Sequence, residues 1–171
     1  MSTSLQALLD QLPQIGRVKW IGIRPPHQTT ASGQKLKMPM QIIDAVEARL
    51  DSGLVGDRYN GKNGKRHVTL IQWEHLPVIA SLIGRESVAP ELLRRNIAIE
   101  GINLLALKDK QFRIGTALLE YTGLCDPCSA MENTFGAGGY NAVRGHGGIT
   151  ARIIEAGVIR LNDSISINNI K

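Results

Sequence analysis

Residues 112 to 128 read Phe112-Arg113-Ile114-Gly115-Thr116-Ala117-Leu118-Leu119-Glu120-Tyr121-Thr122-Gly123-Leu124-Cys125-Asp126-Pro127-Cys128. The run from 112 to 121 is rich in apolar residues, which predicts one buried β-strand. The turn that leaves this strand carries both cysteines of the chain. Because a strand end can hold a side chain toward a pocket, we expect the chemistry of the protein to be located here.

Four interpretations fit the spacing Cys125-x-x-Cys128. The pair could cycle between a dithiol and a disulfide, or it could supply half of a zinc site. One thiolate could instead bind a soft metal or carry sulfur, with its neighbour incidental. In the fourth interpretation, both cysteines are small, buried packing residues.

The rest of the sequence favours a single-thiolate site over zinc binding or thiol exchange. A structural zinc site needs four ligands, and the histidines at positions 27, 67, 75 and 146 lack the short spacing that would complete one. A redox Cys-x-x-Cys usually opens a helix in a βαβ unit, whereas the surroundings here read as β-structure.

The composition is that of an ordinary soluble domain. With 171 residues, 43% hydrophobic and 20% charged, the chain is expected to fold as one domain without disulfides or metals. It has no apolar run of membrane-spanning length and no basic N-terminal leader, so we expect no membrane partner and a cytoplasmic location. A formal charge of +5 with only 4% aromatic residues favours a compact phosphate-bearing cofactor over nucleic acid.

Short strands with glycine turns dominate the predicted elements. Residues 1–15 are expected to form an N-terminal helix or extension, capped by Thr3 or Ser4, that packs on the domain or dimerises. The main domain is assigned to 16–171. Strands are expected at 16–24, 40–50, 97–100 and 112–121, a helix at 73–83, and a closing hairpin at 149–155 and 158–167. We expect a surface hairpin or loop at 28–37 and a polar, glycine-rich stretch at 129–140. The resulting fold class is mainly β, a β-barrel with a few short helices and its site at one mouth.

Two charged segments are candidates for the site. Arg94 and Arg95, next to Asn96, precede the strand at 97–100, and paired guanidinium groups match the geometry of phosphate. Asp57 lies in a glycine turn and is expected to bond nearby backbone amides or to pair with Arg58.

Several segments, taken in order, resemble the MOSC domain. They are Gly53-Leu54-Val55-Gly56-Asp57-Arg58-Tyr59, Asn96-Ile97-Ala98-Ile99-Glu100-Gly101-Ile102, Phe112-Arg113-Ile114-Gly115, Pro127-Cys128, Arg144-Gly145 and Asn162-Asp163-Ser164-Ile165. This domain is the C-terminal module of molybdenum cofactor sulfurases and also occurs as stand-alone bacterial proteins. The resemblance covers about residues 16 to 168, and the order of the motifs is more specific than any one of them.

The resemblance implies a MOSC-type β-barrel that binds molybdenum cofactor, a pterin dithiolene with a phosphate tail, through one cysteine. Cys128 matches the family's metal or sulfur ligand, while Cys125 falls where related proteins vary. Stand-alone members similar to this chain reduce N-hydroxylated compounds such as hydroxylaminopurines, with electrons from a redox donor protein. The residues expected to bind the cofactor are Arg94, Asn96, Arg144, His67 and Asp57.

Three hypotheses of function remain at this point. The first is an oxidoreductase in which Cys128 ligates molybdenum, since the dithiolene already supplies two sulfurs and one soft protein ligand suffices. The second is a carrier that holds sulfur as a Cys128 persulfide or delivers the cofactor without turnover. The third is a thiol oxidoreductase that uses Cys125 and Cys128. Pyridoxal phosphate, which belongs to another domain of the sulfurases, is not expected in this chain.

Overall fold

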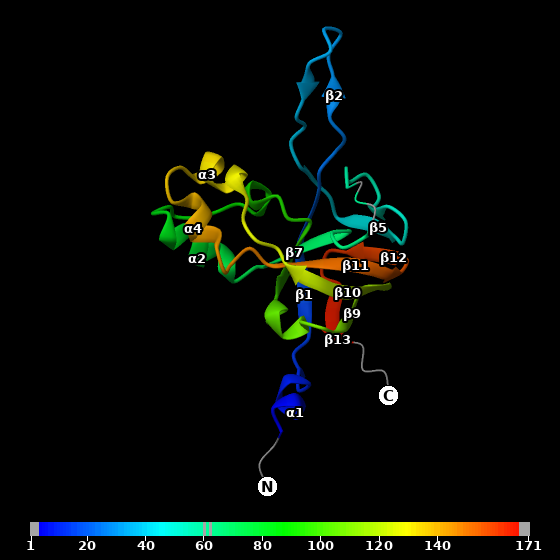
Figure 1. The fold of residues 1–171 in the computed structure, drawn as a ribbon. Helices are drawn as coiled ribbons and strands as arrows, with labels where there is room; N and C mark the ends of the chain where they lie inside the picture. The colour runs from blue at the N-terminus through cyan, green and yellow to red at the C-terminus, as the bar shows by residue number, and fades with distance from the viewer. Residues whose placement is uncertain (1–3, 60, 62, 168–171) are drawn as a thin grey trace.

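A closed β-barrel forms the body of the protein in a computed structural model, which describes residues 4–59, 61 and 63–167 (Figure 1). Its strands are β1 (Gly16–Ile23), β7 (Val68–Gln72), β8 (Ile97–Glu100), β9 (Gln111–Ile114), β10 (Ala117–Leu124), β11 (Ile149–Glu155) and β13 (Ser164–Ile167). They follow one another in the order β13-β9-β10-β11-β7-β8-β1, and β1 pairs with β13 to close the circle. Only β7 and β8 are parallel neighbours among these strands. The predicted mainly β barrel is therefore confirmed.

Aliphatic side chains fill the interior of the barrel. Val18, Leu70, Ile97, Phe112 and Ile149 come from five different strands, and each is fully buried. Fully burying a side chain of this kind contributes about 1.5–3 kcal/mol. The two cysteines are free, so neither takes part in a disulfide.

Shorter strands lie outside the barrel. Beside β1, the main sheet gains β4 (Gln41–Ile42). A second sheet contains β12 (Gly157–Arg160), β5 (Ala45–Arg49) and β6 (Gly53–Leu54). The strands β2 (Gln28–Thr29) and β3 (Lys35–Leu36) form a hairpin that projects far from the barrel (Figure 1). This hairpin agrees with the prediction for residues 28–37.

The helices gather mainly at one side of the barrel, where α2 (His75–Leu82), α3 (Ser129–Phe135) and α4 (Gly139–Val143) lie together (Figure 1). Trp20, Ile79, Met131, Phe135 and Val143 belong to a second hydrophobic core between these helices and the sheet. Two 3-10 helices, η1 (Pro90–Leu93) and η2 (Leu104–Leu107), connect strands. Among the described residues, no helix is long and apolar enough to cross a membrane.

The N-terminal helix α1 (Leu5–Leu9) begins at Ser4, whose hydroxyl oxygen accepts a hydrogen bond from the Ala7 amide. Ser4, one of the two residues predicted as candidates, is therefore the N-cap of this helix. All residues of α1 are exposed, and Lys110 forms an ion pair with Asp10 just after the helix. The division of the chain at residues 15 and 16 stays a prediction, and 1–3 and 168–171 lie outside the described residues.

Three predicted strand arrangements were wrong. The single strand expected at 112–121 is a hairpin, because Gly115 turns the chain with a φ of 56°, in the left-handed region that favours glycine. The hairpin expected at 149–167 does not form, since β11 pairs with β10 and β7, whereas β12 pairs with β5. The strand expected at 40–50 is divided into β4 and β5.

The stretch 129–140, described from the sequence as polar and glycine-rich, contains α3 and the start of α4. Met131 and Phe135 are four residues apart on α3 and both are buried, so they form the apolar face that the helix needs. As a result the Cys-x-x-Cys sequence precedes a helix, and the expectation of purely β surroundings was wrong.

Candidate functional site

Asp57, in the turn after β6, lies at the centre of a buried hydrogen-bond network. Its side chain is 0% exposed. The carboxylate accepts hydrogen bonds from the backbone amide of Arg24 at 2.7 Å and from Nε and Nη2 of the same residue at 3.0 and 2.7 Å. The backbone amide of Tyr59 donates to it at 3.1 Å. Asp57 thus bonds nearby backbone amides as predicted, but its side-chain partner is Arg24 and not Arg58.

The charge state of Asp57 follows from these contacts. Burial alone would raise the pKa of the carboxyl group, but the hydrogen bonds and charge of Arg24, with the two backbone amides, outweigh burial and lower it. Asp57 is therefore an anion at neutral pH, and it holds the Arg24 guanidinium in a fixed orientation.

Asn96, at the start of β8, connects Asp57 to the barrel. Its Oδ1 accepts hydrogen bonds from the backbone amide and the hydroxyl group of Thr69, at 3.1 and 2.8 Å. Its Nδ2 donates to the Gly22 carbonyl at 3.3 Å and to Asp57 Oδ1 at 3.1 Å. Asn96 is 0% exposed, and these contacts make it a positioning residue for Asp57.

The neighbouring arginines at 94 and 95 have different roles. Arg94 adopts a left-handed backbone conformation, with a φ of 59°. Arg95 is 5% exposed, and its guanidinium donates to the carbonyl oxygens of Leu93, Gly147 and Cys125 at 2.8, 2.8 and 3.0 Å. A weaker contact reaches the Asp126 carbonyl at 3.4 Å. The Arg95 guanidinium is thus already hydrogen-bonded to backbone carbonyl groups, including that of Cys125 in the loop of residues 125–128, called the cysteine loop below. Only Arg94 of the predicted pair is left to bind an anion.

The two cysteines lie in different surroundings. Cys125 is 1% exposed, and the guanidinium of Arg66 donates to its Sγ at 3.5 Å. Cys128 is exposed and lies at the N-cap position of α3. The sulfur expected to bind a metal is therefore accessible, while its neighbour is packed into the loop.

A cationic groove with a volume of about 530 Å³ has Thr134 of α3 in its wall. Its basic residues are Arg24, Lys37, Arg58 and Arg94, and Glu91 is its one acidic lining residue among those described. The Nη1 atom of Arg58 is buried and has no hydrogen-bond partner within the described part of the chain. Burial lowers the pKa of Arg58, and the charges of Arg94 and Arg24 lower it further against the opposing effect of Asp57. The groove therefore concentrates positive charge that an anion would neutralise.

The helix α3 connects the exposed thiol with the groove. Thr134 of α3 lines the groove, and Cys128 caps the same helix. Burial lowers the pKa of Arg95, the sulfurs of Cys125 and Cys128 oppose this change, and Arg24 adds to it.

The other two predicted residues lie elsewhere. His67 is 4% exposed; its Nδ1 accepts a hydrogen bond from the Ile153 amide, and its ring packs edge-on against Tyr59. Burial, and then the charge of Arg152, lowers the pKa of His67. Arg144 is exposed at the end of α4. Neither residue lines the groove, so the structure brings together Asp57, Asn96 and Arg94 with Arg24, but not these two.

Comparison with known proteins gives a family. The model of the MOSC domain matches residues 51–166, which is more than half of the chain. The chain belongs to the MOSC-domain family. Solved structures with the same fold include the YuaD protein from Bacillus subtilis, at 18% identity and a TM-score of 0.71, covering 88% of this chain and 94% of that one.

YiiM from Geobacillus stearothermophilus is also similar to this MOSC domain, at 15% identity and a TM-score of 0.68, covering 90% of this chain and 75% of that one. YiiM from Escherichia coli has 18% identity and a TM-score of 0.65, with 91% and 71% covered. Among curated proteins, no match is found. At these identities the likeness to the solved structures shows the fold alone.

Three basic residues of the groove were missed by the sequence interpretation. Arg24 directly follows β1, before two prolines, and belongs to no motif. Lys37 lies in the stretch expected to be a surface hairpin or loop, and Arg58 was considered only as a partner of Asp57. The turn Gly56-Asp57-Arg58 was the available indication of a cationic partner, since a buried acid in a fixed turn requires a cation. The partner could not be identified as Arg24, because Arg24 and Asp57 are separated by 33 residues in the sequence.

Gly148 offers a test of how tightly the cysteine loop is packed. Its φ is 87°, and a Cβ there would collide with the carbonyl oxygen of Leu70. Its own carbonyl oxygen accepts a hydrogen bond from the Cys125 amide at 2.8 Å. We expect Gly148→Ala to lower the free energy of unfolding by more than about 2 kcal/mol, in urea denaturation.

Gly145→Ala is the matched control. Gly145 has a similar φ of 83°, but a Cβ added there would have no neighbouring atom within 4 Å. Only the left-handed conformation should then cost stability, about 1 kcal/mol. Equal losses in the two variants would mean that the contact with Leu70 is unimportant.

Proposed function

We propose that this MOSC protein binds molybdenum cofactor, with Cys128 as the protein ligand of the metal, and reduces N-hydroxylated compounds. The observation that carries the proposal is an exposed thiol at the N-cap of α3, a helix that also lines a groove with four basic side chains. The MOSC domain is associated with molybdenum cofactor binding, which makes this the first choice of ligand.

The described residues fit this cofactor in two respects. A soft thiolate such as that of Cys128 suits a metal that a pterin dithiolene already holds through sulfur. Guanidinium groups bind phosphate through paired N–H donors, and Arg24, Arg58 and Arg94 bring such groups to the groove. No set of three or more metal-ligating side chains is found in the described ranges, so a protein-only metal site does not compete with this assignment.

Each residue of the site has a physical task in this proposal. Asp57 and Asn96 hold the Arg24 guanidinium at the groove, and Arg95 fixes the backbone of the loop that carries the cysteines. Arg58, Arg94 and Lys37 are expected to bind the phosphate tail. When bound, the cofactor would supply the reduction of the N–O bond, with electrons from a redox donor protein. A reducing cytosol would keep both thiols free.

Metal content tests the role of Cys128. After expression in a host that makes the cofactor, the wild-type protein should contain molybdenum close to equimolar with the chain, and Cys128→Ser should contain it only near background. Cys125→Ser is the matched control, because it alters the second thiol of the same loop and should keep the metal. Mass spectrometry of the metal and fluorescence of the released, oxidised pterin are the measurements. Full metal content in Cys128→Ser would contradict the proposal.

Neutralising the groove tests the phosphate site separately. Arg58→Gln and Arg94→Gln should each reduce the pterin retained after gel filtration, by about tenfold, since each removes a charge-assisted hydrogen bond to phosphate. Arg160→Gln also removes a positive charge, but Arg160 is exposed and does not line the groove, so its pterin content should equal that of the wild type. Similar losses in all three variants would indicate a general charge effect and not a phosphate site.

The exposure of Cys128 also suits a second function, that of a sulfur carrier holding a persulfide. The intact mass of the protein distinguishes the two. A mass increase equal to one sulfur atom would favour the carrier, provided that molybdenum and pterin are both missing. The added mass should be lost on reduction and should be absent in Cys128→Ser. A thiol oxidoreductase would instead lose its activity in Cys125→Ser.

A further inference from the structure

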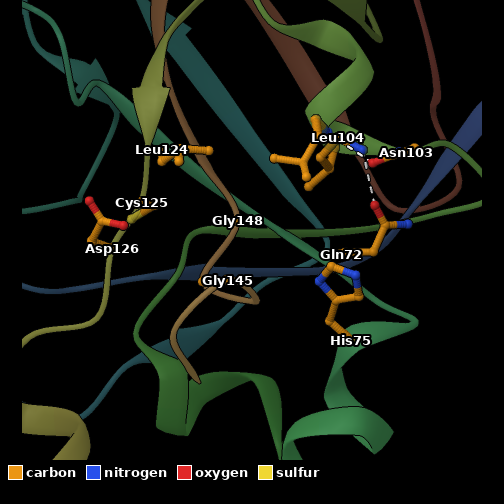
Figure 2. Close-up of a pocket in the computed structure, with 11 residues that line it drawn as sticks. Gln72, His75, Asn103, Leu104, Leu124, Cys125, Asp126, Gly145 and Gly148 are labelled. Atoms are coloured by element: carbon orange, nitrogen blue, oxygen red, sulfur yellow. Dashed lines mark hydrogen bonds between the residues drawn. The ribbon is translucent and has the colours of Figure 1, made fainter. Parts of the chain in front are cut away.

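A second cavity is lined in part by Leu124, Cys125 and Asp126, and it shares no lining residue with the groove. Its volume is about 130 Å³. Figure 2 shows Leu124, Cys125 and Asp126 on one side and Leu104, Gln72 and His75 on the other, with the turn through Gly145 and Gly148 between them. Leu105 completes the lining beside η2.

The surface of this cavity is mainly apolar. Leu104, Leu105, Leu124 and the sulfur-bearing Cys125 line it, together with glycine backbone. Leu105 and Leu124 are 51% and 54% exposed, so apolar surface continues to the outside. Exposed apolar side chains grouped at an opening are typical of a ligand site.

Most of the polar side chains in the wall already have partners. Gln72 Oε1 accepts a hydrogen bond from the Leu104 amide at 3.0 Å, and its Nε2 donates to Glu74 at 2.6 Å. Asn103 Oδ1 accepts from the Leu105 amide at 3.0 Å. These groups fix the shape of the wall and contribute little to binding.

His75 is different. Its Nδ1 is buried and makes no hydrogen bond to any described residue, as is also true of Nδ1 in His146, whose ring packs edge-on at 4.9 Å. Burial lowers the pKa of His75, and the charge of His146 adds to this effect, while a contact with the His146 backbone and the charge of Glu74 oppose it. His75 is therefore a neutral imidazole, which can donate or accept one hydrogen bond. Because His75 lines the cavity, a ligand that pairs with an imidazole nitrogen there would gain affinity.

The size of the cavity limits the ligand. An apolar cavity of about 150 Å³ in another protein holds one benzene molecule. We propose that this cavity binds a single aromatic ring that carries one hydroxyl or ring N–H group, with the ring between the leucines and the polar group on His75. The inference needs neither metal nor cofactor, so it stands or falls independently of the proposed function.

The experiment compares phenol with benzene as probes, by amide chemical shifts in two-dimensional NMR of the full chain. Phenol should shift the amide signals of Gly145, Gly147 and Gly148, which line the cavity, and should bind about tenfold tighter than benzene. In His75→Phe, which keeps the ring but removes its nitrogens, this preference should disappear.

A second variant keeps the inference testable if His75→Phe fails to fold. Leu105→Trp places a large ring at the opening and should abolish binding of both probes. Leu82→Trp, a change of the same kind at an exposed position of α2 outside the cavity, should bind as the wild type does. The inference is overturned if phenol leaves the three glycine signals unshifted, if Leu105→Trp binds unchanged, or if a folded His75→Phe still prefers phenol.

Discussion

Arg95→Met is expected to lower the free energy of unfolding by about 3 kcal/mol or more, and to release the cysteine loop from the barrel. The guanidinium of Arg95 is buried and donates to carbonyl oxygens from three separate segments, at Leu93, Gly147 and Cys125. Methionine fills a similar volume but donates nothing, so these buried acceptors lose their charged partner. Urea denaturation followed by circular dichroism measures the loss.

The neighbouring residue supplies the control. Arg94→Met removes the same side chain one position earlier, but Arg94 lines the groove and donates to none of these carbonyl groups. Its effect on stability should stay below about 1 kcal/mol. A further readout is the reactivity of Cys125 toward a thiol reagent, which should rise in Arg95→Met and stay low in Arg94→Met, because only the first change loosens the loop. Equal stability of the two variants would contradict the role assigned to Arg95.

Asp57→Asn is expected to lower the free energy of unfolding by about 3 kcal/mol at neutral pH, because it leaves the Arg24 guanidinium beside a neutral amide. The wild type should also lose stability in acid. Its Asp57 has a pKa below that of the unfolded chain, which is about 3.9, so the stabilisation is complete above that value. It is lost progressively as the pH falls through the folded-state pKa.

The difference in stability between the wild type and Asp57→Asn should therefore be large at pH 7 and should shrink as the pH falls below about 4. Urea denaturation at a series of pH values measures it. Asp44→Asn is the control, because Asp44 is exposed, and its effect should stay within about 0.5 kcal/mol at every pH. A difference for Asp57→Asn that is constant with pH would mean that the carboxylate charge is not what stabilises the turn.

The fold class could be predicted from the sequence because it depends on local patterns. The β-branched run of β1, the helical spacing of α2 and the short strand β8 each lie where expected. Strand pairing could not be predicted, since β12 pairs with β5, more than a hundred residues earlier in the chain. The hairpin at Gly115 was missed because apolar residues continue on both sides of the turn, so periodicity did not reveal it.

Part of the site could also be predicted, because it too depends on local sequence patterns. Cys128 and Arg94 lie at turns that adjoin recognisable elements; Arg94 lines the groove, and Cys128 caps the helix whose Thr134 lines it. The sequence could not distinguish Arg94 from Arg95, because the difference comes from one left-handed residue and from carbonyl groups about 30 to 50 residues away. Arg24 was missed because its importance depends on Asp57, a contact that only the folded barrel creates.

Closure of the barrel by β13 has a consequence for synthesis of the protein in the cell. β13 pairs with both β1 and β9, yet the ribosome makes it after every other strand of the barrel. Until then the nascent chain exposes two unpaired strand edges, which can join to other chains. A chain truncated before Ser164 should therefore aggregate unless a chaperone binds it. In the complete barrel, β13 pairs with β1 and β9 and so covers both edges.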